Sequence, residues 1–147
     1  MPSISSAIPS KIAPKPTVLV LDDEEFIRDL VADALESEGY RVIQAADGRE
    51  GLALVESECP NAIVLDLMMP RMNGMEFLNR LQHHHCPVIV LSASLNDSLR
   101  KQCSEAGVCA ILDKPFSLAR LRSLVKDAVQ ESLRRPPILI DAGHLDS

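Results

Sequence analysis

The stretch AIVLDLMMPRMNG, residues 62–74, decides the fold. It opens with an apolar run of strand length, ends that run on the carboxylate of Asp66, and then turns at Pro70 and Gly74. A short apolar run that is bounded by turn residues is typical of a strand buried on both faces of a sheet. The stretch therefore predicts a central strand that carries Asp66 to the edge of a sheet.

Strand-like and helix-like segments alternate five times around this stretch. The expected strands are 17–21, 41–45, 62–67, 87–93 and 108–112, and the expected helices are 25–39, 47–58, 73–82, 95–107 and 117–133. Such alternation predicts a parallel sheet with helices on both faces. Because crossovers are right-handed, the favoured fold is an α/β, doubly wound, five-stranded parallel sheet in the order 2-1-3-4-5, the flavodoxin-like (βα)5 arrangement. The polar ends of 41–45 predict an edge strand.

Length and composition set the organisation of the chain. Its 147 residues predict one domain at 17–131, preceded by a flexible tail at 1–16 and followed by a tail or linker at 132–147. The net charge of −6 argues against a direct nucleic-acid or membrane-surface binder. Because no apolar run has the length of a membrane span and 1–16 lacks the apolar core of a signal peptide, we expect a cytoplasmic location.

Acidic residues follow two strands that the predicted order makes neighbours. The strand at 17–21 is followed by Asp22 and Asp23, and the strand at 62–67 carries Asp66. Two like charges about 4 Å apart repel by roughly 4 kcal/mol at an effective dielectric near 20, so a cation should offset them. Since carboxylate oxygens suit a hard divalent ion, the sequence predicts magnesium (Mg2+) at the point where the winding of the sheet reverses.

Two further strand ends add chemistry for a phosphoryl group. The strand at 87–93 carries the hydroxyl of Ser92, and the strand at 108–112 leads into Asp113, Lys114 and Pro115. An acceptor carboxylate, a metal, a hydroxyl and an ammonium together suit phosphoryl transfer, with Asp66 as the nucleophile. Ser92 would hydrogen-bond one phosphoryl oxygen, and Lys114 would neutralise others.

Each of these residues, taken alone, has a simpler explanation. Asp22 and Asp23 are common helix-capping residues, and Asp66 could be an ordinary strand end. Ser92 alone is most often a turn hydroxyl, and Lys114 alone is usually solvated. The functional interpretation depends on their arrangement, because all five polar side chains fall at the same end of successive predicted strands.

The motifs VLDDEE, VLDLMMPRMNG, VLSAS and LDKPF resemble, in order and spacing, the receiver domain of bacterial two-component response regulators. The resemblance covers roughly residues 17–131. It implies that Asp66 accepts phosphate from a histidine kinase or a histidine phosphotransfer protein, while Ser92 and Lys114 bind phosphoryl oxygens. It also implies a cis peptide bond between Lys114 and Pro115, which costs little because the second residue is proline.

The resemblance further implies a ligand set for magnesium and a surface for output. Asp23 and Asp66 would bind the ion directly, Asp22 largely through water, and the backbone carbonyl of Met68 would be the third protein ligand. A downstream protein partner would bind the face formed by the expected elements at 95–107, 108–112 and 117–133, which carries Arg100, Lys101, Arg120 and Arg122. The sequence leaves homodimerisation through this face open, and leaves open whether the chain is a stand-alone regulator or a receiver from a larger hybrid kinase.

Two positions depart from the pattern of the family. Ile111 stands where an aromatic residue is usual, three residues before Lys114, so the usual coupling between the hydroxyl and an aromatic ring is in question. Met68, two residues after Asp66, offers no polar side chain to position an attacking water. We therefore expect that replacing Met68 by Asn or Glu alters the rate of dephosphorylation.

Two alternative functions come from other classes. A phosphatase of the haloacid dehalogenase type also places an aspartate nucleophile, a hydroxyl, a lysine and magnesium at strand ends. It needs a second aspartate two residues after the nucleophile, where this chain has Met68, and it needs a cap domain. The other alternative is a binding module that no longer accepts phosphate, but the complete set of acidic residues, hydroxyl and lysine argues against it.

Overall fold

The computed structural model describes residues 14–69, 73–81, 85–93 and 96–134. Five strands form one parallel sheet in the order β2-β1-β3-β4-β5, which confirms the predicted topology and the edge position of the second strand. The strands are β1 (Thr17–Leu21), β2 (Arg41–Ala45), β3 (Ala62–Asp66), β4 (Val88–Ser92) and β5 (Ala110–Asp113). The helices are α2 (Glu25–Glu36), α3 (Gly48–Glu58), α4 (Gly74–Arg80), α5 (Asp97–Glu105) and α6 (Leu118–Arg134).

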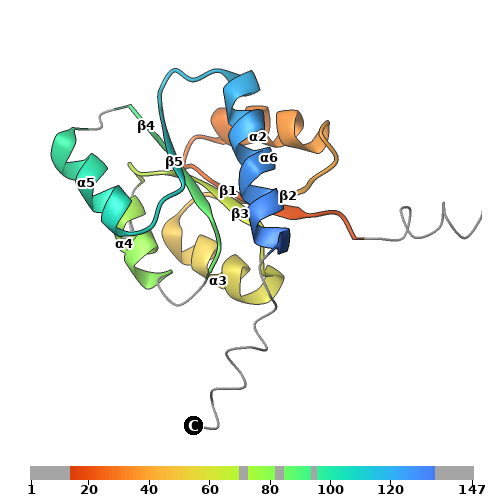
Figure 1. Cartoon of the computed structure of the whole chain (residues 1–147), viewed down its shortest axis with the longest axis horizontal. Helices are drawn as coiled ribbons and strands as arrows, with labels where there is room; N and C mark the ends of the chain where they lie inside the picture. Colours follow the sequence, from red (N-terminus) through yellow and green to blue (C-terminus); the bar gives the residue numbers. More distant parts are fainter. Residues whose placement is uncertain (1–13, 70–72, 82–84, 94–95, 135–147) are drawn as a thin grey trace, which may run out of the picture.

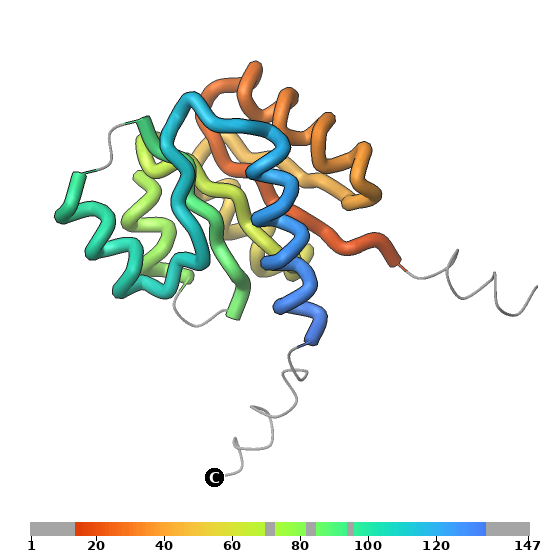
Figure 2. Tube along the Cα trace, turned by 45° about the horizontal axis from the view of Figure 1, so that its top comes forward, coloured from red at the N-terminus to blue at the C-terminus, as the bar shows by residue number. Residues whose placement is uncertain are grey.

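Helices cover both faces of the sheet. Helices α2 and α6 lie side by side on one face, and α3, α4 and α5 cover the other (Figure 1). Figure 2 follows the chain from red to blue and shows that the last helix, α6, returns to lie beside α2. Among the described residues, no helix is both long enough and apolar enough to cross a bilayer.

The central strand β3 is buried along its whole length because its alternating side chains serve two cores. Ile63 and Leu65 pack with α3, α4 and α5, whereas Val64 packs with α2 and α6. A strand that separates two apolar layers must be apolar on both faces, which explains the unbroken run before Asp66. Asp66 is thus the first polar side chain of β3, and it lies at the carboxyl edge.

The turn after β3 needs glycine at position 74. A Cβ atom at Gly74 would lie 2.5 Å from the Cα atom of Leu67, which is closer than two carbon atoms can pack. The N–H of Gly74 donates to the carbonyl of Leu67 at 2.9 Å and so fixes this close approach. Pro70, the other turn residue of the sequence prediction, lies outside the described residues.

The fifth strand begins two residues later than predicted. Val108 was expected to start it, but its N–H donates to the carbonyl of Cys103 at 3.1 Å and closes the end of α5. Gly107 precedes it with a φ of +84°, the left-handed conformation that commonly ends a helix. The apolar character of Val108 therefore belongs to a helix end, and β5 starts at Ala110.

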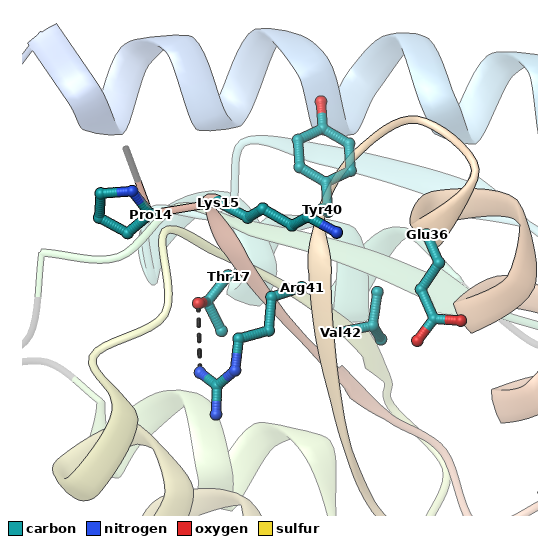
Figure 3. A pocket seen from close by; sticks show the side chains of 7 residues that line it. All are labelled: Pro14, Lys15, Thr17, Glu36, Tyr40, Arg41 and Val42. Atoms are coloured by element: carbon teal, nitrogen blue, oxygen red, sulfur yellow. Dashed lines mark hydrogen bonds between the residues drawn. The ribbon is translucent and has the colours of Figure 1, made fainter. Parts of the chain in front are cut away.

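At the amino-terminal edge of the sheet, polar groups from neighbouring elements pair with one another. Asn61 accepts a hydrogen bond from the N–H of Thr17 at 2.9 Å, and Arg41 forms an ion pair with Glu58 at 2.8 Å. Arg41 also donates to the hydroxyl of Thr17 at 3.4 Å, at the wall of a hollow beside the start of β1 and β2 (Figure 3). The hollow is lined by Pro14, Lys15, Thr17, Glu36, Tyr40, Arg41 and Val42.

Candidate functional site

Three carboxylates meet at the opposite, carboxyl-terminal edge of the sheet. Leu21 and Leu65 are partners in neighbouring strands, so the residues that follow them, Asp22 and Asp66, lie next to each other. Both are buried, while Asp23 is exposed. Each of the three offers a carboxylate oxygen within 4.8 Å of those of the other two. The convergence predicted from the strand ends is therefore present.

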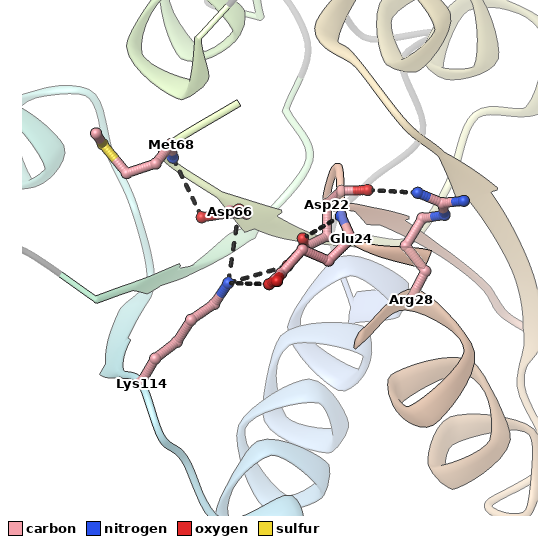
Figure 4. Close-up of polar contacts among 6 residues, drawn as sticks. All are labelled: Asp22, Glu24, Arg28, Asp66, Met68 and Lys114. Carbon is pink, nitrogen blue, oxygen red and sulfur yellow. Dashed lines mark hydrogen bonds and ion pairs between the residues drawn. The ribbon is translucent and has the colours of Figure 1, made fainter. Parts of the chain in front are cut away.

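Lys114 places its ammonium among the acidic side chains of this edge (Figure 4). Its Nζ atom lies 3.1 Å from Oδ2 of Asp22, 3.5 Å from Oδ2 of Asp66 and 3.9 Å from Oε1 of the exposed Glu24. One cation is thus shared by three carboxylates. Acidic charge exceeds basic charge at this position, and the excess attracts further cations.

The electrostatics of Asp66 follow from this shortage of positive charge. Burial raises the pKa of Asp66 to about 6, and the neighbouring charge of Asp22 adds to the rise. The N–H of Met68, which donates to Oδ1 of Asp66 at 3.1 Å, and the ammonium of Lys114 both lower this pKa but do not cancel the rise. The ionised form of Asp66 is therefore less favourable in the folded chain than in water.

The pKa of Lys114 responds in the opposite sense to burial and to charge. Burial lowers the pKa of Lys114, but attraction to Asp22 and Asp66 outweighs burial, and the pKa is raised overall. Lys114 is therefore a permanent cation at neutral pH. A permanent cation beside a buried carboxylate suits the binding of an incoming anion such as a phosphoryl group.

Ser92 and Lys114 are joined through the backbone. Ser92 is fully buried at the end of β4 and is the register partner of Asp113. The N–H of Lys114 donates to the carbonyl of Ser92 at 2.9 Å, which places both residues at the same edge as Asp66. The peptide bond between Lys114 and Pro115 is cis, as the resemblance implies.

The two departures from the family pattern have different environments. Ile111 is partly buried and packs against the core beneath α3, α4 and α5. The side chain of Met68 is exposed, and Met68 as a whole has a relative exposure of 59%, so its apolar end is open to solvent beside Asp66. Met68, two residues after Asp66, therefore contributes a backbone N–H to the site and no polar side chain.

Helix capping does not account for the acidic pair. Glu24 is the N-cap residue of α2, and it forms no side-chain capping hydrogen bond. Oδ1 of Asp22 accepts the N–H of Glu24 at 2.9 Å, which holds the turn before the helix. Oδ2 of Asp22 points to Lys114, so this side chain links the turn to the charged site.

Sequence reasoning missed two residues that contact the site, Glu24, which lies 3.9 Å from the ammonium of Lys114, and Arg28. Arg28 donates through Nη1 to the backbone carbonyl of Asp22 at 2.8 Å and through Nε to Oε1 of Gln44 at 3.3 Å. The available signal was electrostatic, since a cation in the first turn of a helix opposes the helix dipole. Arg28 occupies the first turn of α2, and its contacts with the turn and with β2 explain why a basic residue is placed there.

The fold and the site define a class of protein. This is a flavodoxin-like (βα)5 protein whose carboxyl edge combines three carboxylates with a lysine. The family described as the response regulator receiver domain matches residues 18–126. The chain belongs to that family.

Curated relatives support this assignment. The chain is 36% identical over 149 aligned residues to the alkaline phosphatase synthesis transcriptional regulatory protein SphR of Synechococcus elongatus, covering 91% of this chain and 58% of the relative. It is 42% identical over 114 residues to response regulator RR06 of Streptococcus pneumoniae, covering 77% of this chain and 52% of the relative. The chain thus spans about half the length of the curated relatives it matches.

Solved receiver-domain structures superpose on this chain over nearly their whole length. The receiver domain of Francisella response regulator 1452 superposes with a TM-score of 0.76 at 32% identity, covering 80% of this chain and 99% of that one. A CheY-like receiver domain protein from Methanospirillum hungatei superposes with a TM-score of 0.78 at 29% identity, covering 82% and 98%. The described fold is therefore that of a whole receiver domain.

Proposed function

We propose that this chain is a phosphoacceptor signalling domain of a two-component phosphorelay, which takes a phosphoryl group from a histidine kinase or a histidine phosphotransfer protein onto Asp66. One observation carries the proposal. Asp66 is buried, it is adjacent to the carboxylate of Asp22, and it lies 3.5 Å from the ammonium of Lys114. That combination supplies a nucleophile and a charge partner for the group it would accept.

Magnesium fits the donors of the site. The three clustered carboxylates are all oxygen donors, which a hard divalent cation prefers, and their charge exceeds that of Lys114. Asp22, Asp23 and Asp66, with the backbone carbonyl of Met68, would hold the ion. When bound, magnesium supplies neutralisation of the charge on phosphoryl oxygens.

The side chains of the chain have separate roles in the transfer. An oxygen of Asp66 forms a bond to phosphorus while the bond from phosphorus to the donor imidazole nitrogen breaks, and the electron pair of that bond stays on the imidazole. Because the pKa of Asp66 is about 6, the carboxylate is ionised and nucleophilic in most molecules at neutral pH. Lys114 and Ser92 bind phosphoryl oxygens and hold the added charge. In the later hydrolysis a water oxygen bonds to phosphorus and gives its proton to solvent, the bond from phosphorus to the Asp66 oxygen breaks, and inorganic phosphate leaves.

Output is proposed to occur through protein contacts in the cytoplasm. The candidate surface is formed by α5, β5 and α6, where Arg100 and Asp113 pair at 3.5 Å and both side chains are exposed. A downstream protein would bind this face, and a second copy of the chain is the other candidate for it. Contact with nucleic acid or with a membrane is not part of the proposal, in agreement with the net charge of −6.

Incubation with acetyl phosphate and magnesium, followed by intact mass measurement, tests the function. We expect a gain of one phosphoryl group that is lost when the metal is chelated and lost in Asp66→Asn. The matched control Asp127→Asn removes an exposed carboxylate of α6 and should keep the gain. No gain in the wild-type chain would favour a module that does not accept phosphate, and a gain retained by Asp66→Asn would exclude Asp66 as the acceptor.

A further inference from the structure

Asp22 is held by partners on every side. Its N–H donates to the carbonyl of Ala45 at 3.2 Å, Oδ1 accepts from Glu24 and Oδ2 accepts from Lys114. The remaining polar group, its backbone carbonyl, accepts from Arg28 at 2.8 Å. Asp22 retains only 1% of its exposure, so loss of any one of these bonds leaves a buried group without its partner.

The carbonyl of Ala45 connects this turn to β2 through the main chain, and Arg28 connects it to the same strand through a side chain. The same guanidinium reaches Oε1 of Gln44 in β2, so it bridges the turn between β1 and α2 to the edge of the sheet. Figure 4 shows Arg28 and Lys114 approaching Asp22 from opposite sides. Lys114 contacts the carboxylate, whereas Arg28 contacts the main chain.

We propose that Arg28 is a positioning residue, which fixes the backbone of Asp22 and thereby the cation-binding carboxylates. The inference rests on the proposed function, because it concerns the magnesium site of that function. Asp23 follows Asp22 directly, so a displaced Asp22 carbonyl rotates the peptide unit that carries Asp23. Partners that orient metal ligands typically change metal affinity by about 10- to 100-fold when they are removed.

A planar guanidinium suits this task better than an ammonium. Arginine presents several N–H donors in a fixed fork, so one side chain reaches two acceptors with little loss of freedom. Lysine carries the same charge but a single donor group on a flexible stem. A requirement for both contacts therefore predicts that Arg28→Lys is only partly functional.

A purely electrostatic role for Arg28 predicts the opposite sign. The guanidinium is a cation near a cation site, so if only its charge mattered, removal would strengthen magnesium binding. If it positions the turn, removal weakens binding in spite of the lost repulsion. The direction of the change therefore separates the two roles.

Calorimetric titration of the unphosphorylated full chain with magnesium tests the inference. We expect Arg28→Met to weaken binding about tenfold, with Arg28→Lys between that variant and the wild type. Gln44→Met should weaken binding less, and the double variant should be no weaker than Arg28→Met alone, because both substitutions break one bridge. The control Arg80→Met removes an exposed cation from the last turn of α4 and should leave the affinity unchanged.

Unchanged or tighter magnesium binding in Arg28→Met overturns the inference, and so does wild-type affinity in Arg28→Lys. Urea unfolding in chelator checks that each variant is folded. If Arg28→Met does not fold, Gln44→Met and Arg28→Lys still decide the result. Failure of the proposed function is distinguishable, because the wild-type chain itself would then bind no magnesium and gain no phosphoryl group.

Discussion

The two edges of one sheet treat charge in different ways. At the amino-terminal edge, Arg41 meets Glu58 at 2.8 Å, one base for one acid, and both are partly open to solvent. At the carboxyl edge, the single ammonium of Lys114 is shared by three carboxylates, those of Asp22, Asp66 and the exposed Glu24, so negative charge is in excess there. The central strands β1, β3 and β4 are buried from one edge to the other, so the difference arises from the residues at and beyond the strand ends.

The difference shows where the fold accepts a cost in stability. Paired groups at the amino-terminal edge contribute little and cost little. At the carboxyl edge a buried carboxylate keeps a pKa of about 6, so its ionised form opposes folding until a cation or a covalent change relieves it. A cation or phosphoryl group that relieves this repulsion therefore gains, as binding free energy, what the ionised Asp66 costs the free energy of unfolding.

Removal of the shared cation should have the largest effect. In Lys114→Met, loss of an ammonium that faces the accepted phosphoryl group should slow phosphorylation by about 100-fold or more. Time-resolved intact mass with acetyl phosphate measures the rate. Lys126→Met, which removes an exposed cation of α6, is the control. Equal rates in the two variants would mean that the contrast between the edges has no bearing on the chemistry.

Removal of the buried negative charge of Asp66 should stabilise the metal-free chain. The pKa of Asp66 rises from 3.8 in the unfolded chain to about 6, so the folded state favours the protonated form. The wild type therefore loses up to about 3 kcal/mol as the pH rises through this interval. Asp66→Asn lacks that loss, so it should be more stable by about 2–3 kcal/mol near neutral pH and equally stable below about pH 4.

Urea unfolding in chelator across this pH range measures the effect on both chains. The control Asp127→Asn should follow the wild-type curve. A variant Asp66→Asn that keeps the full decline of stability with pH would show that another group is responsible. Added magnesium should stabilise the wild type more than Asp66→Asn, since the ion relieves the same repulsion.

A polar side chain beside Asp66 should shorten the lifetime of the phosphoryl group. Met68→Asn places an amide where an exposed thioether now stands, and an amide can orient water. We expect dephosphorylation to become faster by about threefold to tenfold, well below the ~100-fold that a full general base provides. Met68→Glu should change the rate as well, and Met68→Leu should not. The decay of the phosphorylated mass after removal of the donor gives the rates.

The paired edge should respond least. Arg41→Met breaks the ion pair with Glu58, and partly exposed pairs of this kind are worth about 0.5 kcal/mol. Phosphorylation at the other edge should be unchanged. Urea unfolding and the phosphorylation assay together measure both statements. A loss of phosphorylation in Arg41→Met would show that the two edges are coupled through the sheet.

Much of the fold could be predicted because its causes are local in the sequence. Apolar runs such as 62–65 can only be buried between two layers, and their alternation with helices leaves few parallel topologies. The start of β5 could not be predicted, because Val108 is as suitable for a strand as for a helix end. Its hydrogen bond to Cys103 decided between them.

The candidate site was predictable to the extent that it depends on strand ends. Asp66 ends a strand, Asp22 and Lys114 each follow one, and parallel strands bring such positions to one edge. Arg28 lies on a helix, and its contact with Gln44 depends on how α2 is placed against β2. The sequence contains both residues but not the tertiary geometry that joins them.

Lys114 also connects an edge strand of the sheet, β5, with the carboxylates at its centre. Its main chain directly follows β5, one of the two edge strands, while its ammonium lies between Asp22 and Asp66 near the centre of the sheet. A change in the charge of Asp66 therefore changes the electrostatic force on the ammonium of Lys114, whose main chain continues β5. We therefore expect β5 to respond to the charge state of Asp66 in β3 without any rearrangement of β4, the strand between them.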